Sequence, residues 1–108
     1  MEDLKEKKCK PCEGGVEPLK PEQIDYIKNG ISKGWTVEDN KLLKRNFPFE
    51  NFKRGMAFAQ EVGIIAESEN HHPDICISYK YVEISLTTHA IGGLSENDFI
   101  MAAKIDEI

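Results

Sequence analysis

The sequence is short of several features that would identify a common class of protein. No apolar run approaches the roughly 20 residues that cross a bilayer, and the start, MEDLKEKKCK, lacks the apolar stretch of a signal peptide. We therefore expect a cytoplasmic protein with no membrane partner. Lysine and arginine number 14 against 19 aspartate and glutamate, a formal net charge of −5. Because no basic excess is available to hold phosphates, nucleic-acid binding is not expected.

Cysteine is scarce, and its count of three is odd, which argues against a disulfide framework. Cys9 and Cys12 form a CxxC pair, but a zinc site needs two further ligands and no second CxxC exists. The polar run MEDLKEKK before the pair also lacks the strand that thioredoxin-like chemistry requires. The spacing therefore favours a packed or idle pair. Cys76 stands in a β-type run and is predicted to be a small core residue.

What is present fits one folded domain, since 108 residues support one modest core. Residues 1–18 are charged and contain Gly14, Gly15 and Pro18, which predicts an irregular N-terminal extension. Residues 19–108 are expected to form the single domain. Repeats and low-complexity segments are absent.

Helical spacing appears three times. PEQIDYIKNGISKG (21–34) predicts a first helix, weakened at its end by glycines and at its start by Lys20, a poor N-cap. Residues 51–66 carry the clearest stripe, predicted to be core: Phe52, Gly55, Met56, Phe58, Ala59, Val62, Gly63, Ile65 and Ala66. A last helix follows Ser95, a good N-cap, with its apolar side chains at Phe99, Ala102, Ala103 and Ile105.

Strand patterns lie between the helices. Residues 35–37 and 43–49 predict two strands around a turn at 38–41, with Pro48 ending the second strand or placing it at an edge. In DICISYKYVEISLTTHA the apolar residues change from odd to even positions, which predicts a hairpin turning near Lys80 and Tyr81. Tyr79 is interpreted as core. The fold class is therefore α+β, a four-stranded antiparallel sheet with three helices on one face in the order α-β-β-α-β-β-α.

The three histidines are the residues best suited to chemistry near neutral pH. His71 and His72 are adjacent, so in extended backbone their side chains diverge and joint binding of one metal ion is awkward. A metal site would have to recruit His89 with carboxylates or Cys76, and this spacing matches no zinc motif. No metal is therefore expected. From the residues alone, both a proton-transfer site and a solvated loop stay open.

A wider constellation surrounds these histidines, and its members keep a fixed spacing: Glu67, His71, His72, Pro73, Tyr79, His89 and Asp98. This constellation resembles the signature of the pterin-4a-carbinolamine dehydratases. The flanking stretches FPFENFKRGMAFAQEV and ISLTTHAIGGLSENDF, and the earlier LKPEQI and GW, resemble that family too. The resemblance covers roughly residues 19–105.

The resemblance implies a hydro-lyase that removes water from 4a-hydroxytetrahydrobiopterin to give the quinonoid dihydropterin, in tetrahydrobiopterin recycling, without a cofactor. It makes His71, His72 and His89 the catalytic, pterin-binding trio. It also implies a homodimer or homotetramer and a metabolic link to phenylalanine hydroxylase. The alternative is a non-catalytic interaction module, because in animals the same fold serves as a dimerisation cofactor for a homeodomain transcription factor. The residues expected to contact or position the pterin are Glu67, Pro73, Thr88, Ala90, Ile91 and Asp98.

Two of these residues are acids with competing interpretations. Glu67 is predicted at the carboxyl end of a helix, where a negative charge is unfavourable, and this placement favours pairing with an imidazole. Asp98 could orient a histidine or bind the pterin edge. It could equally complete a helix N-terminus with Ser95, three residues earlier.

Overall fold

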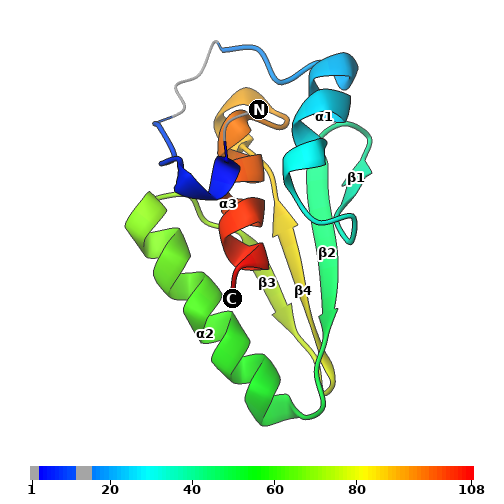
Figure 1. The fold of residues 1–108 in the computed structure, drawn as a ribbon, viewed down its shortest axis with the longest axis vertical. Coiled ribbons are helices and arrows are strands. Elements are labelled where there is room, and N and C mark those ends of the chain that lie inside the picture. Colours follow the sequence, from blue (N-terminus) through cyan, green and yellow to red (C-terminus); the bar gives the residue numbers. More distant parts are fainter. Residues whose placement is uncertain (1–2, 12–15) are drawn as a thin grey trace.

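The computed structural model describes residues 3–11 and 16–108, which form an α+β fold around one antiparallel sheet (Figure 1). The strands lie in the order β1-β2-β4-β3, and the predicted fold class is confirmed. No helix in these residues is long and apolar enough to cross a membrane. In chain order the elements are η1 (Leu4–Glu6), α1 (Pro21–Ile27), η2 (Lys28–Gly30), β1 (Thr36–Glu38), β2 (Leu42–Pro48), α2 (Phe52–Glu69), β3 (Asp74–Ile77), β4 (Tyr81–Leu86), η3 (His89–Ile91) and α3 (Glu96–Asp106).

The two faces of the sheet differ sharply in polarity. On the face toward the helices, Leu43 lies opposite Leu86, and both are fully buried. The other face is open and polar, with Lys44 3.8 Å from Glu83 across two strands. Cys76 pairs with Glu83 in register, so it lies on this open face and is exposed. The prediction that Cys76 is a core residue is therefore wrong, because strand alternation turns Ile75 and Ile77 toward α2 and Cys76 to the opposite face.

Tight turns set the register of both hairpins. Asp39 and Asn40 have positive φ angles of 51° and 57°, and the Lys41 N–H donates to the Glu38 carbonyl at 2.9 Å, so a tight turn leads from Glu38 to its partner Leu42. The Ser78 N–H donates to the Tyr81 carbonyl at 2.8 Å, which closes the predicted turn between β3 and β4. Tyr79 stands in that turn and is 72% exposed, so the prediction that it belongs to the core is wrong. Pro48 is the last residue of β2, as its missing N–H requires.

Helix α2 crosses the sheet toward the edge strand β3 (Figure 1). Its buried residues are Gly55, Phe58, Ala59, Val62 and Ala66. Phe52 and Met56, also predicted to be core, are 46% and 44% exposed. Met56 lies near Ile75 and Ile77 of β3. Because β3 is the edge strand, no further strand in the described residues covers these three side chains.

The first helix is shorter than predicted. It ends at Ile27 and continues as the 3-10 turn η2 to Gly30. Its start is better capped than Lys20 suggests, because the Gln23 side chain accepts a hydrogen bond from the Lys20 N–H at 2.7 Å. Ile24 anchors the helix in the core at 2% exposure.

The segment before α1 packs against the fold. Residues 4–6, predicted to be irregular, form the 3-10 turn η1, and Leu4 is 3% exposed in the core. The Lys104 ammonium on α3 donates to the Lys5 carbonyl at 3.0 Å. The N-terminal residues therefore lie along α3, as Figure 1 shows.

Candidate active site

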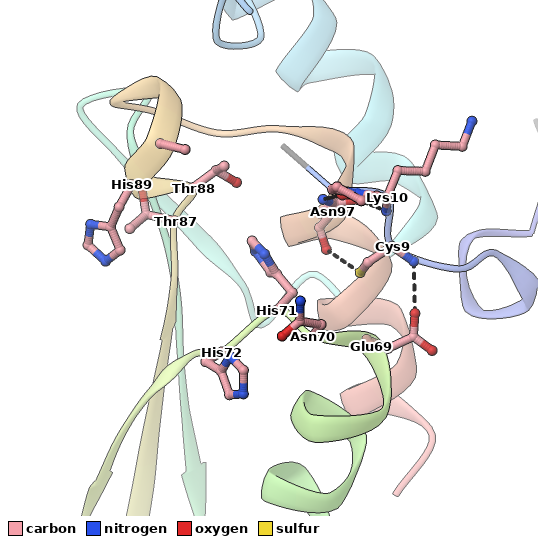
Figure 2. Close-up of a pocket in the computed structure, with 12 residues that line it drawn as sticks. Cys9, Lys10, Glu69, Asn70, His71, His72, Thr87, Thr88, His89 and Asn97 are labelled. Carbon is pink, nitrogen blue, oxygen red and sulfur yellow. Dashed lines mark hydrogen bonds between the residues drawn. The ribbon is translucent and has the colours of Figure 1, made fainter. Parts of the chain in front are cut away.

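A cavity of about 470 Å³ lies where four segments meet beside the sheet. These segments are the N-terminal residues, the turn after α2, the end of β4 with η3, and the start of α3. Figure 2 shows His71 between Thr87–His89 on one side and Cys9 with Lys10 on the other. The lining residues are Cys9, Lys10, Pro11, Glu69, Asn70, His71, His72, Thr87, Thr88, His89, Ala90 and Asn97.

The end of α2 places the first two histidines. Asn70 ends the helix in the left-handed conformation, with φ of 52°, and the His71 N–H donates back to the Ala66 carbonyl at 3.2 Å. The chain then enters β3 at Asp74. The two side chains diverge as predicted, since His71 is 12% exposed and His72 is 54% exposed.

His71 is held by a buried carboxylate. Its Nε2 atom lies 2.7 Å from Asp98 Oδ1, and Asp98 is fully buried. Asp98 Oδ2 accepts from the Thr88 hydroxyl at 2.8 Å and from the Ser95 N–H at 3.0 Å. Asp98 thus contacts His71 with one oxygen and caps α3 with the other. Asp98 lies behind the histidine and does not line the cavity.

This arrangement selects one tautomer of His71. An ionised carboxylate can only accept hydrogen bonds, so the proton of the neutral ring sits on Nε2. Nδ1 then carries the lone pair. Among the described residues, no hydrogen bond occupies that nitrogen. Nδ1 is therefore the ring nitrogen that can accept a hydrogen bond.

His72 has a carboxylate partner of its own. Its Nε2 atom lies 2.5 Å from Glu67 Oε2, the pairing that the placement of Glu67 in the last turn of α2 had indicated. Both side chains are largely exposed, 54% for His72 and 80% for Glu67. An exposed pair of this kind contributes little stability, so its value lies in orienting the ring.

His89 belongs to a different element, the turn η3 that follows β4. The turn ends at Gly92 with φ of 69°, and the Thr88 N–H donates to the Gly93 carbonyl at 2.9 Å. His89 is exposed at the cavity rim, and Ala90 beside it lines the cavity. Of the other predicted contact residues, Glu67, Pro73 and Ile91 do not line it.

The N-terminal contribution to the cavity was missed from the sequence. Cys9, Lys10 and Pro11 precede the stretch that resembles a known family, and nothing in their composition signals a site. Glu69 and Asn97 were missed for a different reason. They look like ordinary helix-end residues beside the motif, and only the fold turns them toward the N-terminal segment.

Cys9 is a protected thiol. Burial, reinforced by the negative charge of Glu69, raises the pKa of Cys9 to about 12 from its usual 9.0. Its Sγ atom lies 3.6 Å from the Asn97 carbonyl. Cys9 is thus packed, as expected, whereas Cys12, its CxxC partner, lies outside the described residues. No group of three or more histidine, cysteine or acidic side chains is placed to hold a metal ion within residues 3–11 and 16–108.

We expect Cys9 to alkylate at least about tenfold more slowly than exposed Cys76 at pH 8, because its thiolate is scarce. Peptide mass spectrometry after timed iodoacetamide exposure of a Cys12→Ser variant measures both rates, and urea should remove the difference. The folded state holds the Cys9 proton more tightly than the unfolded chain. Any stability this contributes is present below pH 9 and is lost as pH rises toward 12. Equal rates in folded protein would contradict the burial of Cys9.

The family model described as pterin 4 alpha carbinolamine dehydratase matches residues 17–108. This match covers most of the chain. The chain belongs to the pterin-4a-carbinolamine dehydratase family.

Curated relatives that carry the family's name match nearly the whole chain. A Nitrosomonas eutropha protein is 48% identical over 104 residues, which are 96% of this chain and 91% of the relative. A Rubrobacter xylanophilus protein is 46% identical over 108 residues, which are 100% of both chains. Family membership therefore extends through the histidine site.

Solved structures share the fold. A Brucella melitensis structure described as a transcriptional coactivator/pterin dehydratase has a TM-score of 0.78 and 27% identity, covering 84% of this chain and 97% of its own. A second structure, of a pterin dehydratase-like protein identified as a RuBisCO assembly factor in the alpha-carboxysome, has a TM-score of 0.60. It is 23% identical and covers 70% of this chain and 92% of its own, so it speaks for the fold alone.

Proposed function

We propose that this protein dehydrates 4a-hydroxytetrahydropterins, with 4a-hydroxytetrahydrobiopterin as the substrate, and so returns the pterin to the recycling of tetrahydrobiopterin. The observation that carries the proposal is the pairing of His71 with buried Asp98 at the wall of a cavity that His72 and His89 also line. Family membership supports this class of reaction.

The reaction needs two proton transfers and no change of oxidation state. The C4a–O bond breaks, and the hydroxyl leaves as water after it takes a proton from an acid. N5 gives its proton to a base, and the electron pair of that N–H bond forms the C4a=N5 double bond of the quinonoid dihydropterin. Two positioned imidazoles are sufficient for this chemistry near neutral pH, so we propose neither a metal nor a cofactor.

We assign the base to His71 and the acid to His89. His71 has its Nε2 proton held by Asp98, so its Nδ1 is the acceptor for the N5 proton. His89 comes from a separate element on the exposed rim, where an imidazolium is well solvated and can protonate the leaving hydroxyl. His72, paired with Glu67, then serves to bind the pterin and not to transfer a proton.

The remaining contacts would come from the β4–η3 connection. Thr88 and Ala90 line the cavity, but the Thr88 N–H and carbonyl are already bonded to Gly93 and Ile91, so Thr88 would contribute packing contact and Ala90 would be the neighbour of the pterin edge. Pro73 and Ile91 do not reach the cavity, so in this proposal they shape the segments that carry His72 and Ala90.

A direct assay tests the proposal. Chemically generated 4a-hydroxytetrahydrobiopterin loses water spontaneously, and its ultraviolet absorbance reports the rate. We expect catalytic amounts of the protein to accelerate this loss in metal-free buffer that contains a chelator. No acceleration by protein shown to be folded would contradict the proposal, and acceleration that vanishes with the chelator would contradict the metal-free mechanism.

A role as a protein-interaction module is the second candidate. The Brucella melitensis structure is described as both coactivator and dehydratase, and Met56, Ile75 and Ile77 line an apolar hollow beside the free edge of β3. We propose that this face serves self-association into a dimer or tetramer.

His89→Ala separates dehydration from self-association, since it should abolish dehydration and leave the mass in solution unchanged. In the dehydratase proposal, a phenylalanine hydroxylase is the enzyme expected to supply the substrate.

A further inference from the structure

The outer wall of the cavity is a short strap, residues 9–11, contributed by the N-terminal segment. The family model begins at residue 17, so the strap lies outside the stretch it matches. The strap contains three of the cavity-lining residues, Cys9, Lys10 and Pro11. It faces His71 across the cavity (Figure 2).

Asn97 is the first anchor of the strap. The Lys10 N–H donates to Asn97 Oδ1 at 3.0 Å, and Asn97 Nδ2 donates back to the Lys10 carbonyl at 2.5 Å. This two-point contact resembles one rung of a β-ladder and fixes both the position and the direction of the backbone. Asn97 is only 6% exposed, so the contact is made in a partly dehydrated setting, where hydrogen bonds are stronger.

Glu69 is the second anchor. Its Oε1 accepts from the Cys9 N–H at 2.8 Å, and its side chain is 9% exposed. Glu69 is the last residue of α2, where the helix dipole disfavours a carboxylate. Lys104 on α3, 3.7 Å from Glu69 Oε2, offsets that cost and also donates to the Lys5 carbonyl. The hydrogen bond from the Cys9 N–H to Glu69 explains why a carboxylate stands at this unfavourable end of α2.

Both anchors are sequence neighbours of the His71–Asp98 pair. Asn97 immediately precedes Asp98 at the start of α3. Glu69 is the last residue of α2, and His71 follows two residues later in the turn after that helix. The elements that position the catalytic pair therefore also fix the distance from His71 to the strap. If the strap had no role in the site, its backbone would not need hydrogen bonds to both Asn97 and Glu69, the two residues beside the His71–Asp98 pair.

Resting on the function proposed above, we propose that the strap is a wall of the pterin site and that Asn97 and Glu69 are positioning residues that set substrate affinity through it. The strap lines the cavity with Cys9, Lys10 and Pro11, and the Lys10 ammonium points away from the histidines in Figure 2. It therefore offers shape and contact but no proton-transferring group. Its loss should weaken binding of substrate and transition state alike, which raises KM and leaves kcat unchanged.

Steady-state dehydration kinetics on full-length variants test this. Asn97→Ala removes the paired hydrogen bonds to the Lys10 backbone, and Glu69→Ala removes the other anchor, which belongs to α2 and not to the helix that carries Asp98. Each should raise KM about tenfold, with kcat within about threefold of wild type. Glu69→Gln keeps an acceptor for the Cys9 N–H and should restore KM to within about threefold. The exposed neighbour Lys8, changed to alanine, is the matched control and should leave both constants unchanged.

The pH profile of kcat separates positioning from damage to the histidines. It should coincide for wild type, Asn97→Ala and Glu69→Ala. Unchanged KM in both alanine variants, or a lower kcat at constant KM, would overturn the role of the strap while wild-type activity upheld the dehydratase function. If the wild type itself shows no dehydration, the function and the strap's role fail together.

Discussion

Asp98→Asn is expected to lower kcat for dehydration by about 10²–10⁴-fold, close to the loss expected for His71→Ala, although the imidazole stays in place. The reason is the direction of one hydrogen bond. The Ser95 N–H can only donate, so the oxygen of an asparagine must stay where Asp98 Oδ2 now accepts from it. The amide nitrogen then faces His71 Nε2.

An amide nitrogen donates and cannot accept, so His71 Nε2 would have to become the acceptor and the ring proton would move to Nδ1. Nδ1 is the nitrogen assigned to receive the substrate's proton. The variant would thus keep the shape of the site and lose its base. Helix α3 should keep its start, because the asparagine oxygen still accepts from the Ser95 N–H.

Glu96→Gln is the matched control for this exchange. It neutralises a carboxylate in the same first turn of α3, where Glu96 pairs with Lys7 and touches no histidine. We expect kcat to stay within about threefold of wild type. Thermal unfolding should show both variants folded at the assay temperature. An Asp98→Asn variant as active as the Glu96→Gln variant would show that the tautomer of His71 does not matter, and the assignment of His71 as the base would be wrong.

The sequence predicted the histidine site better than its surroundings because the site is made of local signals. His71 and His72 follow the end of a strongly periodic helix, and His89 follows the strand that pairs with theirs, so hairpin geometry alone places them at one end of the sheet. The N-cap position of Ser95 likewise placed Asp98. The double role of Asp98 depends on a contact 27 residues apart in sequence, which no local rule specifies.

The wrong predictions for Cys76 and Met56 depend on what lies beside a strand. The apolar pattern around Cys76 marks a strand but does not say which face the helices cover, and the cysteine lies on the open one. Met56 obeys the helical period yet faces past the edge strand β3. The strap at residues 9–11 is held by side chains 60 and 87 residues away, so its place at the cavity could not be predicted from its own sequence.

Asp106→Ala should destabilise the fold by about 2–4 kcal/mol, the largest loss of stability we expect from a polar exchange. Asp106, the last residue of α3, accepts from the Trp35 indole N–H at 2.8 Å, the Arg45 guanidinium at 2.6 Å and the Ser32 N–H at 2.9 Å. Its side chain is 14% exposed and that of Arg45 is 26% exposed, so water can replace the carboxylate only in part. Alanine would leave three hydrogen-bond donors without their acceptor: the Arg45 guanidinium, the Trp35 indole N–H and the Ser32 N–H.

Urea unfolding followed by circular dichroism measures the loss, and two further variants show its origin. Glu50→Gln breaks the exposed Glu50–Arg54 pair, 81% and 70% exposed, and should change the free energy of unfolding by less than about 1 kcal/mol. Arg45→Met added to Asp106→Ala removes the stranded charge, so the double variant should lose less than the sum of the two single losses. If Asp106→Ala proves no costlier than Glu50→Gln, the carboxylate does not hold the fold together. Because α3 carries Asp98 at its other end, a real loss here would also show that the helix holding the His71–Asp98 pair is fixed at both ends.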